Sequence, residues 1–429
     1  MGSSKIGFAF LLVFIFQSSG NAQFVLSGEL RPRAEFRHGY STLAKDGEKT
    51  SIFISQRTRL NVGYTHEHFK IFLSLQDVRT WGDELQLGDV ASTALHEGWG
   101  ELFFCKSFSL RAGRQELVYD DHRLLGNVDW VQQARSHDAA VLKFNKAGWR
   151  ADLGAAYNNE KENLFKAKYT LDNYRVLAFL YLSKTFKEKL SMSLLGITDG
   201  THVKDSLSDD IKYRHTAGPL LTFKTKGLEL SGSFYYQFGQ DVAGKDIRAF
   251  LALFNALYKV KGVTLGAGVD VVSGTDALDA GNKNNNSFNT LYATNHKFYG
   301  FMDHFINLPA HTANGGLIDP YARLGYKFSD KINAYIDYHY FLLENNVADP
   351  ANPSEALDKG LGSEIDAVFN YNIFPMVNIQ AGYSMMFGTS SLETVKKKQK
   401  DGFQNWGWVM LTFKPEFFHS EKFKAKKED

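Results

Sequence analysis

The stretch Gly28-Glu29-Leu30-Arg31-Pro32-Arg33-Ala34-Glu35-Phe36-Arg37 alternates between charged and apolar or small residues. In an extended strand, successive side chains point to opposite faces, so one face of this segment is charged and the other is apolar. A membrane barrel turns its apolar face to lipid, where an arginine at the midplane costs about 2–4 kcal/mol, and turns charged residues to its lumen. The stretch therefore predicts a transmembrane strand whose arginines line a pore.

The same alternation recurs along the chain. It predicts about eighteen strands, an even number within the range of outer-membrane porins. The predicted strands are 24–38, 51–64, 69–77, 95–104, 108–116, 137–144, 149–157, 173–183, 187–198, 211–224, 228–239, 247–259, 263–272, 318–327, 332–343, 360–371, 377–388 and 403–413.

The links between these strands fall into a short set and a long set. The short links are 65–68, 105–107, 145–148, 225–227, 260–262, 328–331 and 372–375, and the long links include 78–94, 117–136, 158–172, 273–317, 344–359 and 389–402. This sorting predicts an all-β fold, an up-and-down antiparallel transmembrane barrel with short periplasmic turns and long extracellular loops. A soluble sandwich or propeller is the alternative, but a sandwich has no reason to sort its links and we find no blade repeat.

The two ends of the chain predict segments outside the barrel. Lys5, the apolar run 6–16 and the small residues before Gln23 predict a secretory signal peptide over residues 1–22. The barrel is then expected over 23–413, followed by a basic periplasmic tail over 414–429. No stretch reaches the roughly 18 apolar residues of a membrane-spanning helix. Cys105 is the only cysteine, so an internal disulfide is excluded.

Several segments resemble the alginate export family of outer-membrane porins. They are Leu75-Gln76-Asp77-Val78-Arg79, 110–117 (LRAGRQEL), 123–130 (RLLGNVDW), 288–303 and Leu361-Gly362-Ser363-Glu364-Ile365-Asp366. These segments occur in the family's order and span nearly the whole mature chain. The resemblance implies an eighteen-stranded barrel in the cell outer membrane, with an arginine-rich pore that passes a polyuronate.

The chemistry of such a pore suits guanidinium groups, which bind carboxylates in a planar, bidentate manner and stay charged. We expect several weak binding sites in file, with Arg114 and Lys297 favoured by motif. The candidate substrate-binding residues are Arg31, Arg33, Arg57, Arg59, Arg111, Arg114, Arg123, Arg135, His296 and Lys297.

Each of these residues has a structural alternative. The arginines could instead form ion pairs that stiffen the barrel wall, because acidic neighbours such as Glu29, Glu35 and Glu101 are available. Arg114 poses a separate problem, because strict alternation places it on the face opposite Arg111. It would have to lie beyond the apolar band or follow a bulge.

The sequence predicts no enzyme, metal site or cofactor. No GxSxG word occurs, and acidic loop groups such as Asp120-Asp121-His122 lack the spacing of a calcium loop. We expect an outer-membrane channel for alginate or a related polyuronate, with outer-membrane lipid, lipopolysaccharide and periplasmic transport machinery as partners and no nucleic acid. A general porin for small anionic sugars and a non-conducting barrel that anchors adhesive loops remain alternatives. Loop length favours 273–317 or 78–94 as a plug.

Overall fold

The computed structural model describes residues 22–165, 169–203 and 210–421. The predicted signal peptide, residues 1–22, lies outside the described residues except for Ala22. In the described part, no helix is both long and apolar enough to cross a membrane.

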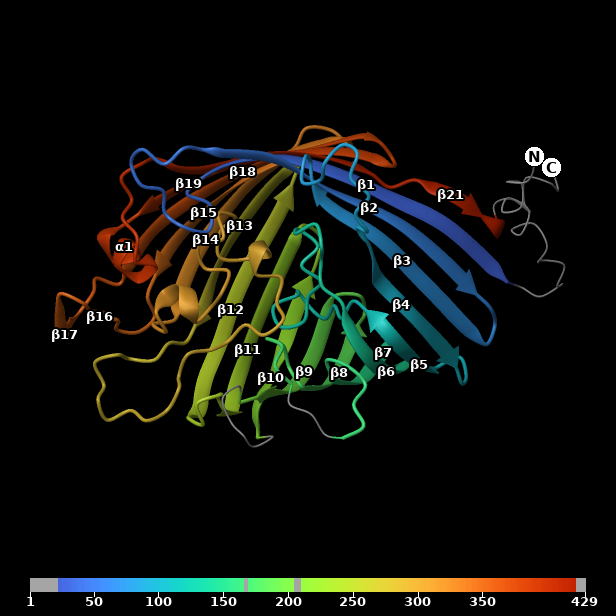
Figure 1. Ribbon diagram of the computed structural model, residues 1–429, viewed down its shortest axis with the longest axis horizontal. Helices are drawn as coiled ribbons and strands as arrows, with labels where there is room; N and C mark the ends of the chain where they lie inside the picture. Colours follow the sequence, from blue (N-terminus) through green and yellow to red (C-terminus); the bar gives the residue numbers. More distant parts are fainter. Residues whose placement is uncertain (1–21, 166–168, 204–209, 422–429) are drawn as a thin grey trace, which may run out of the picture.

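Eighteen long antiparallel strands form one closed barrel (Figure 1). All eighteen predicted strands are confirmed, with ends that shift by a few residues. The wall strands are β1 (Gln23–His38), β2 (Ser51–Thr65), β3 (Phe69–Thr80), β4 (Thr93–Phe103), β5 (Phe108–Gln115), β6 (His137–Lys146), β7 (Trp149–Tyr157), β8 (Val176–Phe186), β9 (Leu190–His202), β10 (Ile211–Lys224), β11 (Leu228–Gln240), β12 (Asp246–Val260), β13 (Val263–Val272), β14 (Leu317–Lys327), β15 (Ile332–Leu342), β18 (Gly360–Phe374), β19 (Val377–Gly388) and β20 (Gln404–Phe413).

Pairing between the last strand and the first closes the sheet. β20 lies antiparallel to β1, with Arg37 opposite Trp406 and Leu30 opposite Phe413. Every other wall strand pairs with its neighbours in sequence. Closure leaves the wall without an open edge, as a strand structure in lipid requires.

The two faces of the wall differ as the alternation predicts. Outward residues such as Leu60, Phe234 and Leu324 are exposed large apolar side chains. Glu29, Arg31 and other charged residues of β1 are instead buried inside the barrel. The outer face therefore suits lipid, and the polar face belongs to the lumen.

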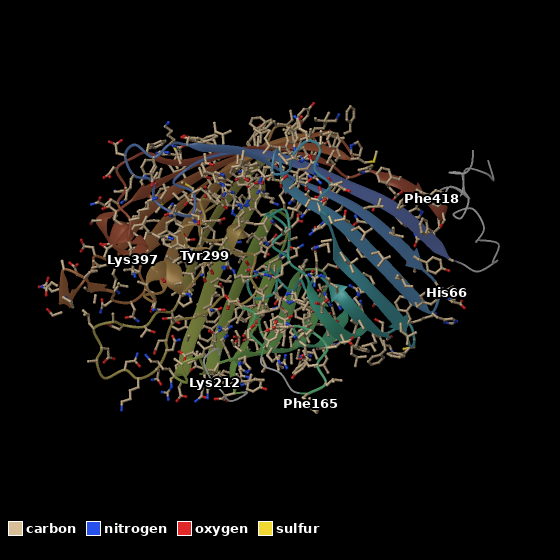
Figure 2. All side chains as sticks on the ribbon, viewed as in Figure 1. His66, Phe165, Lys212, Tyr299, Lys397 and Phe418 are labelled. Atoms are coloured by element: carbon tan, nitrogen blue, oxygen red, sulfur yellow. The ribbon has the colours of Figure 1, made fainter. Side chains whose placement is uncertain are left out.

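Two long loops enter the barrel, and we call 116–136 and 273–316 the inner loops. Their apolar residues, including Leu125 and Phe305, join a buried core with Val141, Leu251 and other inward side chains of the wall. Tyr299, which is 2% exposed, is labelled within the barrel in Figure 2. The lumen is therefore largely filled.

Of the two links predicted as alternative plugs, 273–317 places buried residues inside the barrel, whereas 78–94 does not. β3 and β4 extend into that link and shorten it to residues 81–92, and Leu87 in this loop is fully exposed. The second segment inside the barrel is 116–136, whose leucines Leu124 and Leu125 belong to the same buried core as wall residues such as Val141.

Smaller elements complete the fold. They are the 3-10 helices η1 (Asn295–Lys297) and η2 (Ala310–Thr312), the hairpin β16 (Ala348–Asp349) and β17 (Asn352–Ala356), and helix α1 (Ser390–Lys396).

The predicted basic tail begins as an extra strand. β21 (Glu416–His419) pairs with the beginning of β1, where Val25 lies opposite His419. Figure 2 places His66 of the β2–β3 turn and Phe418 of β21 at the same end of the molecule. The first residues of the tail thus extend the sheet at the end of the short turns, and 422–429 lie outside the described residues.

We predict that an arginine on the outer face destabilises the barrel far more than one on the lumenal face of the same strand. Phe234→Arg places a guanidinium in lipid near the middle of β11 and should lower the free energy of unfolding by about 2–4 kcal/mol. Ser231→Arg, whose side chain faces a lumenal cavity, should cost less than half as much. Urea unfolding in phospholipid vesicles measures both, and equal losses would contradict the assignment of faces.

Candidate functional site

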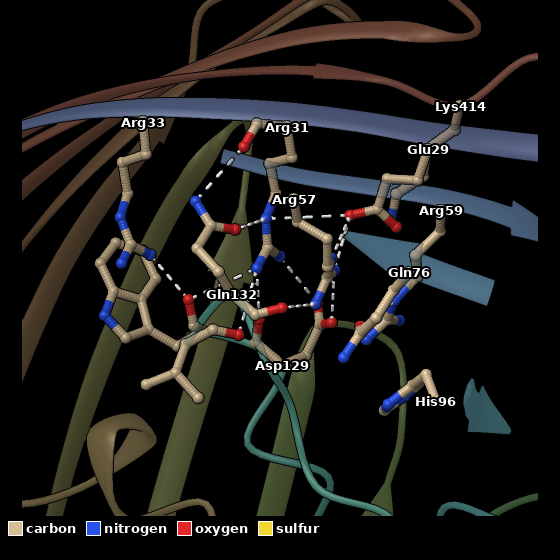
Figure 3. Close-up of polar contacts among 12 residues, drawn as sticks. Glu29, Arg31, Arg33, Arg57, Arg59, Gln76, His96, Asp129, Gln132 and Lys414 are labelled. Carbon is tan, nitrogen blue, oxygen red and sulfur yellow. Dashed lines mark hydrogen bonds and ion pairs between the residues drawn. The ribbon is translucent and has the colours of Figure 1, made fainter. Parts of the chain in front are cut away.

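Four arginines form a row on the inner face of β1 and β2. The register sets Arg31 on β1 directly opposite Arg57 on β2. Arg33 lies on β1 opposite Ser55, and Arg59 lies on β2 opposite Glu29, on the other side of this pair. We call these four arginines the arginine row (Figure 3). Like charges opposite one another in a sheet repel, and burying them away from water adds a desolvation cost. The row is therefore stable only with anionic or carbonyl partners.

Part of the compensation comes from the wall itself. The Glu29 carboxylate accepts from Nη2 of Arg57 at 2.6 Å, and the Glu35 carboxylate accepts from Nε of Arg33 at 2.9 Å. Arg59 donates to the Gln76 side chain at 3.0 Å. These contacts agree with the alternative in which the arginines form ion pairs within the wall.

The remaining compensation comes from the inner loop 116–136. One Asp129 carboxylate oxygen lies 2.7 Å from Nη2 of Arg57, and the other lies 3.3 Å from Nη1 of Arg31. The Trp130 carbonyl accepts from Arg33 at 2.6 Å, and the Gln132 side chain accepts from Arg31 at 3.1 Å. Figure 3 shows Asp129 and Gln132 lying along the row. The row thus holds the loop against the wall.

Aromatic rings join the two inner loops at the same place. The Arg33 guanidinium lies 4.0 Å from the Trp130 ring centre, and Trp130 stacks on His296 at 4.4 Å between ring centres. His296 also stacks on Phe301 at 5.4 Å, and its Nδ1 lies 2.8 Å from the Asp303 carboxylate. The predicted binding residue His296 is therefore buried and bonded within the protein.

The other predicted loop residues differ in whether they bond to carboxylates or to backbone carbonyls. Arg123 is 4% exposed and bonds to the carboxylates of Asp270 at 2.6 Å and Asp121 at 2.8 Å. Arg135 donates to the Ala293 carbonyl at 3.1 Å. Lys297 donates to the Asp121 carbonyl at 3.0 Å, and no carboxylate among the described residues forms an ion pair with it.

The two predicted residues on β5 lie on opposite faces. Arg111 faces the lumen and pairs with Glu101 at 2.7 Å. Arg114 pairs with the exposed Asp138 at 3.0 Å on the outer face, so its predicted place in the pore is wrong. Gly113, with φ of +126°, precedes it as a local irregularity, but Arg114 still points away from the lumen.

A second wall contact, which sequence reasoning missed, holds loop 273–316. The amides of Phe301 and Met302 donate to Asp366 at 3.3 Å and to Glu364 at 2.7 Å. Gly300 has φ of +79°, and a Cβ there would lie 2.7 Å from the Glu364 carboxyl. Both acids lie in the motif 361–366 quoted above, which gave no indication of their partners. Asp129 and Trp130 likewise lay in a quoted motif without an assigned role.

Two cavities lie beside the inner loops and share Lys297, Phe301 and Tyr335 in their lining. One measures about 470 Å³ and includes Arg123 and Arg323, and the other measures about 300 Å³ and includes Trp130 and Trp408. Arg323 is paired with Asp337 at 2.5 Å. Among the described lysines and arginines that line them, only Lys297 lacks a carboxylate partner.

Loop groups near the row have shifted pKa values. Burial alone would raise the pKa of Asp129, but Arg57 and Arg31 together lower it to about 2. Burial lowers the pKa of the Lys297 ammonium; the Asp121 carboxylate opposes this change and Arg123 reinforces it. Asp129 thus stays ionised at any physiological pH.

One cluster in the described residues has the composition of a metal site, namely His96, Glu97 and Glu116. His96 Nε2 lies 2.8 Å from Glu116, and Glu97 accepts from Trp99 Nε1 at 3.2 Å. The acidic group considered from sequence is also bonded within the protein, because Asp120 accepts from Tyr181 at 3.0 Å. These groups satisfy one another.

Comparisons with known proteins give a family and a fold. The family described as Alginate export matches residues 23–389. One similar solved structure is Acinetobacter baumannii OccAB1, with a TM-score of 0.62 and 12% identity, covering 94% of this chain and 99% of that chain. Another is Acinetobacter baumannii OccAB4, with a TM-score of 0.61 and 16% identity, covering 93% of this chain and 99% of that chain. Pseudomonas aeruginosa OccK9 (OpdG) is similar as well, with a TM-score of 0.60 and 13% identity, covering 92% of this chain and 98% of that chain. At these identities the likeness shows the fold. No curated protein sequence matches.

We predict that acid weakens the attachment of loop 116–136 to the wall. Because folding lowers the Asp129 pKa from 3.8 to about 2, the ionised carboxylate stabilises the bound loop above pH 3.8, and this stabilisation is lost as the pH falls through about 2. Hydrogen-exchange protection of the loop amides should therefore hold from pH 7 to pH 4 and then fall.

Asp129→Asn should begin with lower protection at pH 7 and change less on acidification. Asp89→Asn, in the exposed loop 81–92, is the matched control and should behave as wild type. A wild-type acid response that Asp129→Asn leaves intact would show that another group controls the loop.

Proposed function

This chain belongs to the alginate export family and forms an outer-membrane channel of the porin fold, and we propose that it passes an anionic saccharide, alginate or a related polyuronate, through its lumen. The short turns would then face the periplasm and the long loops the cell exterior. Family and fold are those of channels rather than enzymes.

The observation that carries the proposal is the carboxylate already bound to the arginine row. Asp129 lies between Arg57 and Arg31 at 2.7 and 3.3 Å, in the position that a uronate carboxylate would take. Guanidinium groups form charge-assisted bonds with carboxylates and keep their charge at any relevant pH. An arriving polyuronate would therefore compete with Asp129 for the same two arginines.

Lys297 supports a second contact along the route. Its ammonium lines both cavities, has no carboxylate partner among the described residues and lies on a loop that the arginine row helps to hold. A chain with one carboxylate per sugar could bind at Lys297 and the row in succession. Displacement of loop 116–136 would join the two cavities into a wider path.

The filled lumen favours a second candidate, a porin for small anionic sugars and oligosaccharides. The cavities of about 470 and 300 Å³ fall within the range of small-molecule sites. A short solute could occupy one cavity at a time, whereas a polymer would need a continuous path along the lumen.

The proposed partners follow from the surface and the family. The outward apolar residues would contact outer-membrane lipid and lipopolysaccharide, and the short-turn end would face any periplasmic transport machinery.

Efflux from vesicles tests the proposed function. Vesicles that contain the protein are loaded with labelled alginate trimers, with longer alginate chains or with neutral maltotriose. Faster efflux of both alginate lengths than of maltotriose supports the polyuronate channel, and efflux of trimers alone supports the small-solute porin. Equal rates for all three would overturn both, and no efflux would favour a barrel that anchors surface loops.

We predict opposite effects of two neutral substitutions on the affinity for alginate trimers, measured by calorimetry in detergent. Lys297→Gln removes an ammonium that has no carboxylate partner among the described residues and should weaken binding by about tenfold, the equivalent of one charge-assisted hydrogen bond. Asp129→Asn removes the competing carboxylate and should strengthen binding.

Lys283→Gln is the matched control, because Lys283 lies on the exposed part of the same loop as Lys297 and should leave the affinity unchanged. Weaker binding after Asp129→Asn would show that the loop forms part of the binding site and does not compete with the ligand.

A further inference from the structure

A third cavity lies at the short-turn end of the barrel, away from the inner loops. It measures about 370 Å³ and is lined by the ends of β4 to β7 and by the turn 104–107. Lys106, Lys143 and Arg150 contribute to its lining, and Arg111 lies beside it on β5. We call these four side chains and their cavity the vestibule.

The strand register explains why these residues meet. Glu101 lies opposite Arg111, Ser109 lies opposite Lys143, and Lys143 lies opposite Asp152. Lys143 and Arg150 share the parity of Val141 and Asp152, which are buried inside the barrel, so they face the lumen. Lipid headgroups on the outer face therefore cannot reach them.

The vestibule has an excess of positive charge. Its four cations face two carboxylates, and Glu101 is shared by Arg111 at 2.7 Å, Lys143 at 3.5 Å and the Ser109 hydroxyl at 2.7 Å. Asp152 pairs with Arg150 at 2.5 Å. Lys106 has no hydrogen bond or ion pair among the described residues. In this respect the vestibule differs from the arginine row, where Asp129 supplies an additional anion.

The rim of the barrel at the short-turn end is basic as well. Exposed lysines occur at most of the short turns and outnumber the acidic residues there; they are Lys106, Lys146, Lys187, Lys189, Lys224, Lys226, Lys259, Lys261, Lys327, Lys331 and Lys414. A concave site with one sign of charge focuses the electrostatic field and raises the association rate of an oppositely charged solute. Lys106 belongs both to this rim and to the vestibule, whereas Lys224, Lys327 and Lys414 of the rim are paired with acidic residues.

We infer that the vestibule binds an acidic sugar unit of the transported saccharide at the short-turn mouth, apart from the arginine row. The inference rests on the proposed function and adds a separate site to it. The cavity size suits a small part of a saccharide chain, and the excess charge suits its carboxylate. Because Lys106 has no ion pair among the described residues and Lys143 lies 3.5 Å from Glu101, both can bind the ligand without breaking a strong internal contact.

Side-specific block of single channels tests the inference. The protein is inserted in bilayers of neutral phosphatidylcholine, which removes anionic lipid as a competing ligand, and alginate trimer is added to one side at a time. A membrane-impermeant maleimide, which reacts with the exposed Cys105 of the turn 104–107, identifies the short-turn side after each recording.

The test variant is Lys106→Gln/Lys143→Gln. It leaves the Arg150–Asp152 and Arg111–Glu101 pairs in place, so the barrel should fold. We expect the rate constant of block from the short-turn side to fall about tenfold at 0.1 M salt, with block from the other side unchanged, and the difference to shrink at 1 M salt. The control Lys146→Gln/Lys331→Gln removes two rim lysines outside the vestibule and should change the rate much less.

The outcomes separate the two proposals. Equal block of the test and control variants, with the wild type still blocked by alginate trimer, overturns the vestibule and leaves the proposed function intact. Wild-type channels that conduct but are not blocked by the trimer from either side overturn the proposed function itself.

Discussion

The arrangement of the lumen depends on the cost of burying the arginine row. Arg57 is fully buried and Arg31 is 4% exposed, and the strand register sets these two cations opposite each other. A buried ion pair is stable only when geometry and further hydrogen bonds offset desolvation. The wall supplies Glu29 and Glu35, and the inner loop 116–136 supplies Asp129 and backbone carbonyls. The position of that loop is thus a consequence of the charges on β1 and β2.

The second inner loop follows from the first. Trp130 stacks on His296, and Leu125 and Tyr292 form a parallel backbone bridge between the two loops. The amides of loop 273–316 then bond to the acids of β18 on another part of the wall. The two wall contacts, at β1–β2 and at β18, are separated in the sheet by β19 and β20. Together they hold one connected group of loops, so a change at Asp129 affects both loops.

The wall of the barrel could be predicted from sequence because its signals are local. Alternation identified every wall strand, and the lengths of most links indicated the end of the barrel at which they lie. The positions of the loops depend on distant contacts and could not be predicted in the same way. Leu85 and Leu87 of the exposed loop 81–92 are as apolar as Leu124 and Leu125 of the inner loop, so composition did not distinguish them. The motif led to the prediction that Arg114 lines the pore, and this prediction was wrong, although the alternation had already placed Arg114 on the outer face.

The arginines themselves were predicted correctly as lumenal on β1 and β2, but their partners were not, because Asp129 is far from them in sequence. Single-channel conductance of the refolded protein in a planar bilayer tests the account most directly. We expect a low, anion-selective conductance that alginate trimers reduce and neutral trisaccharides do not. A wide conductance that is cation-selective or insensitive to alginate would contradict a lumen in which paired arginines and inner loops control passage.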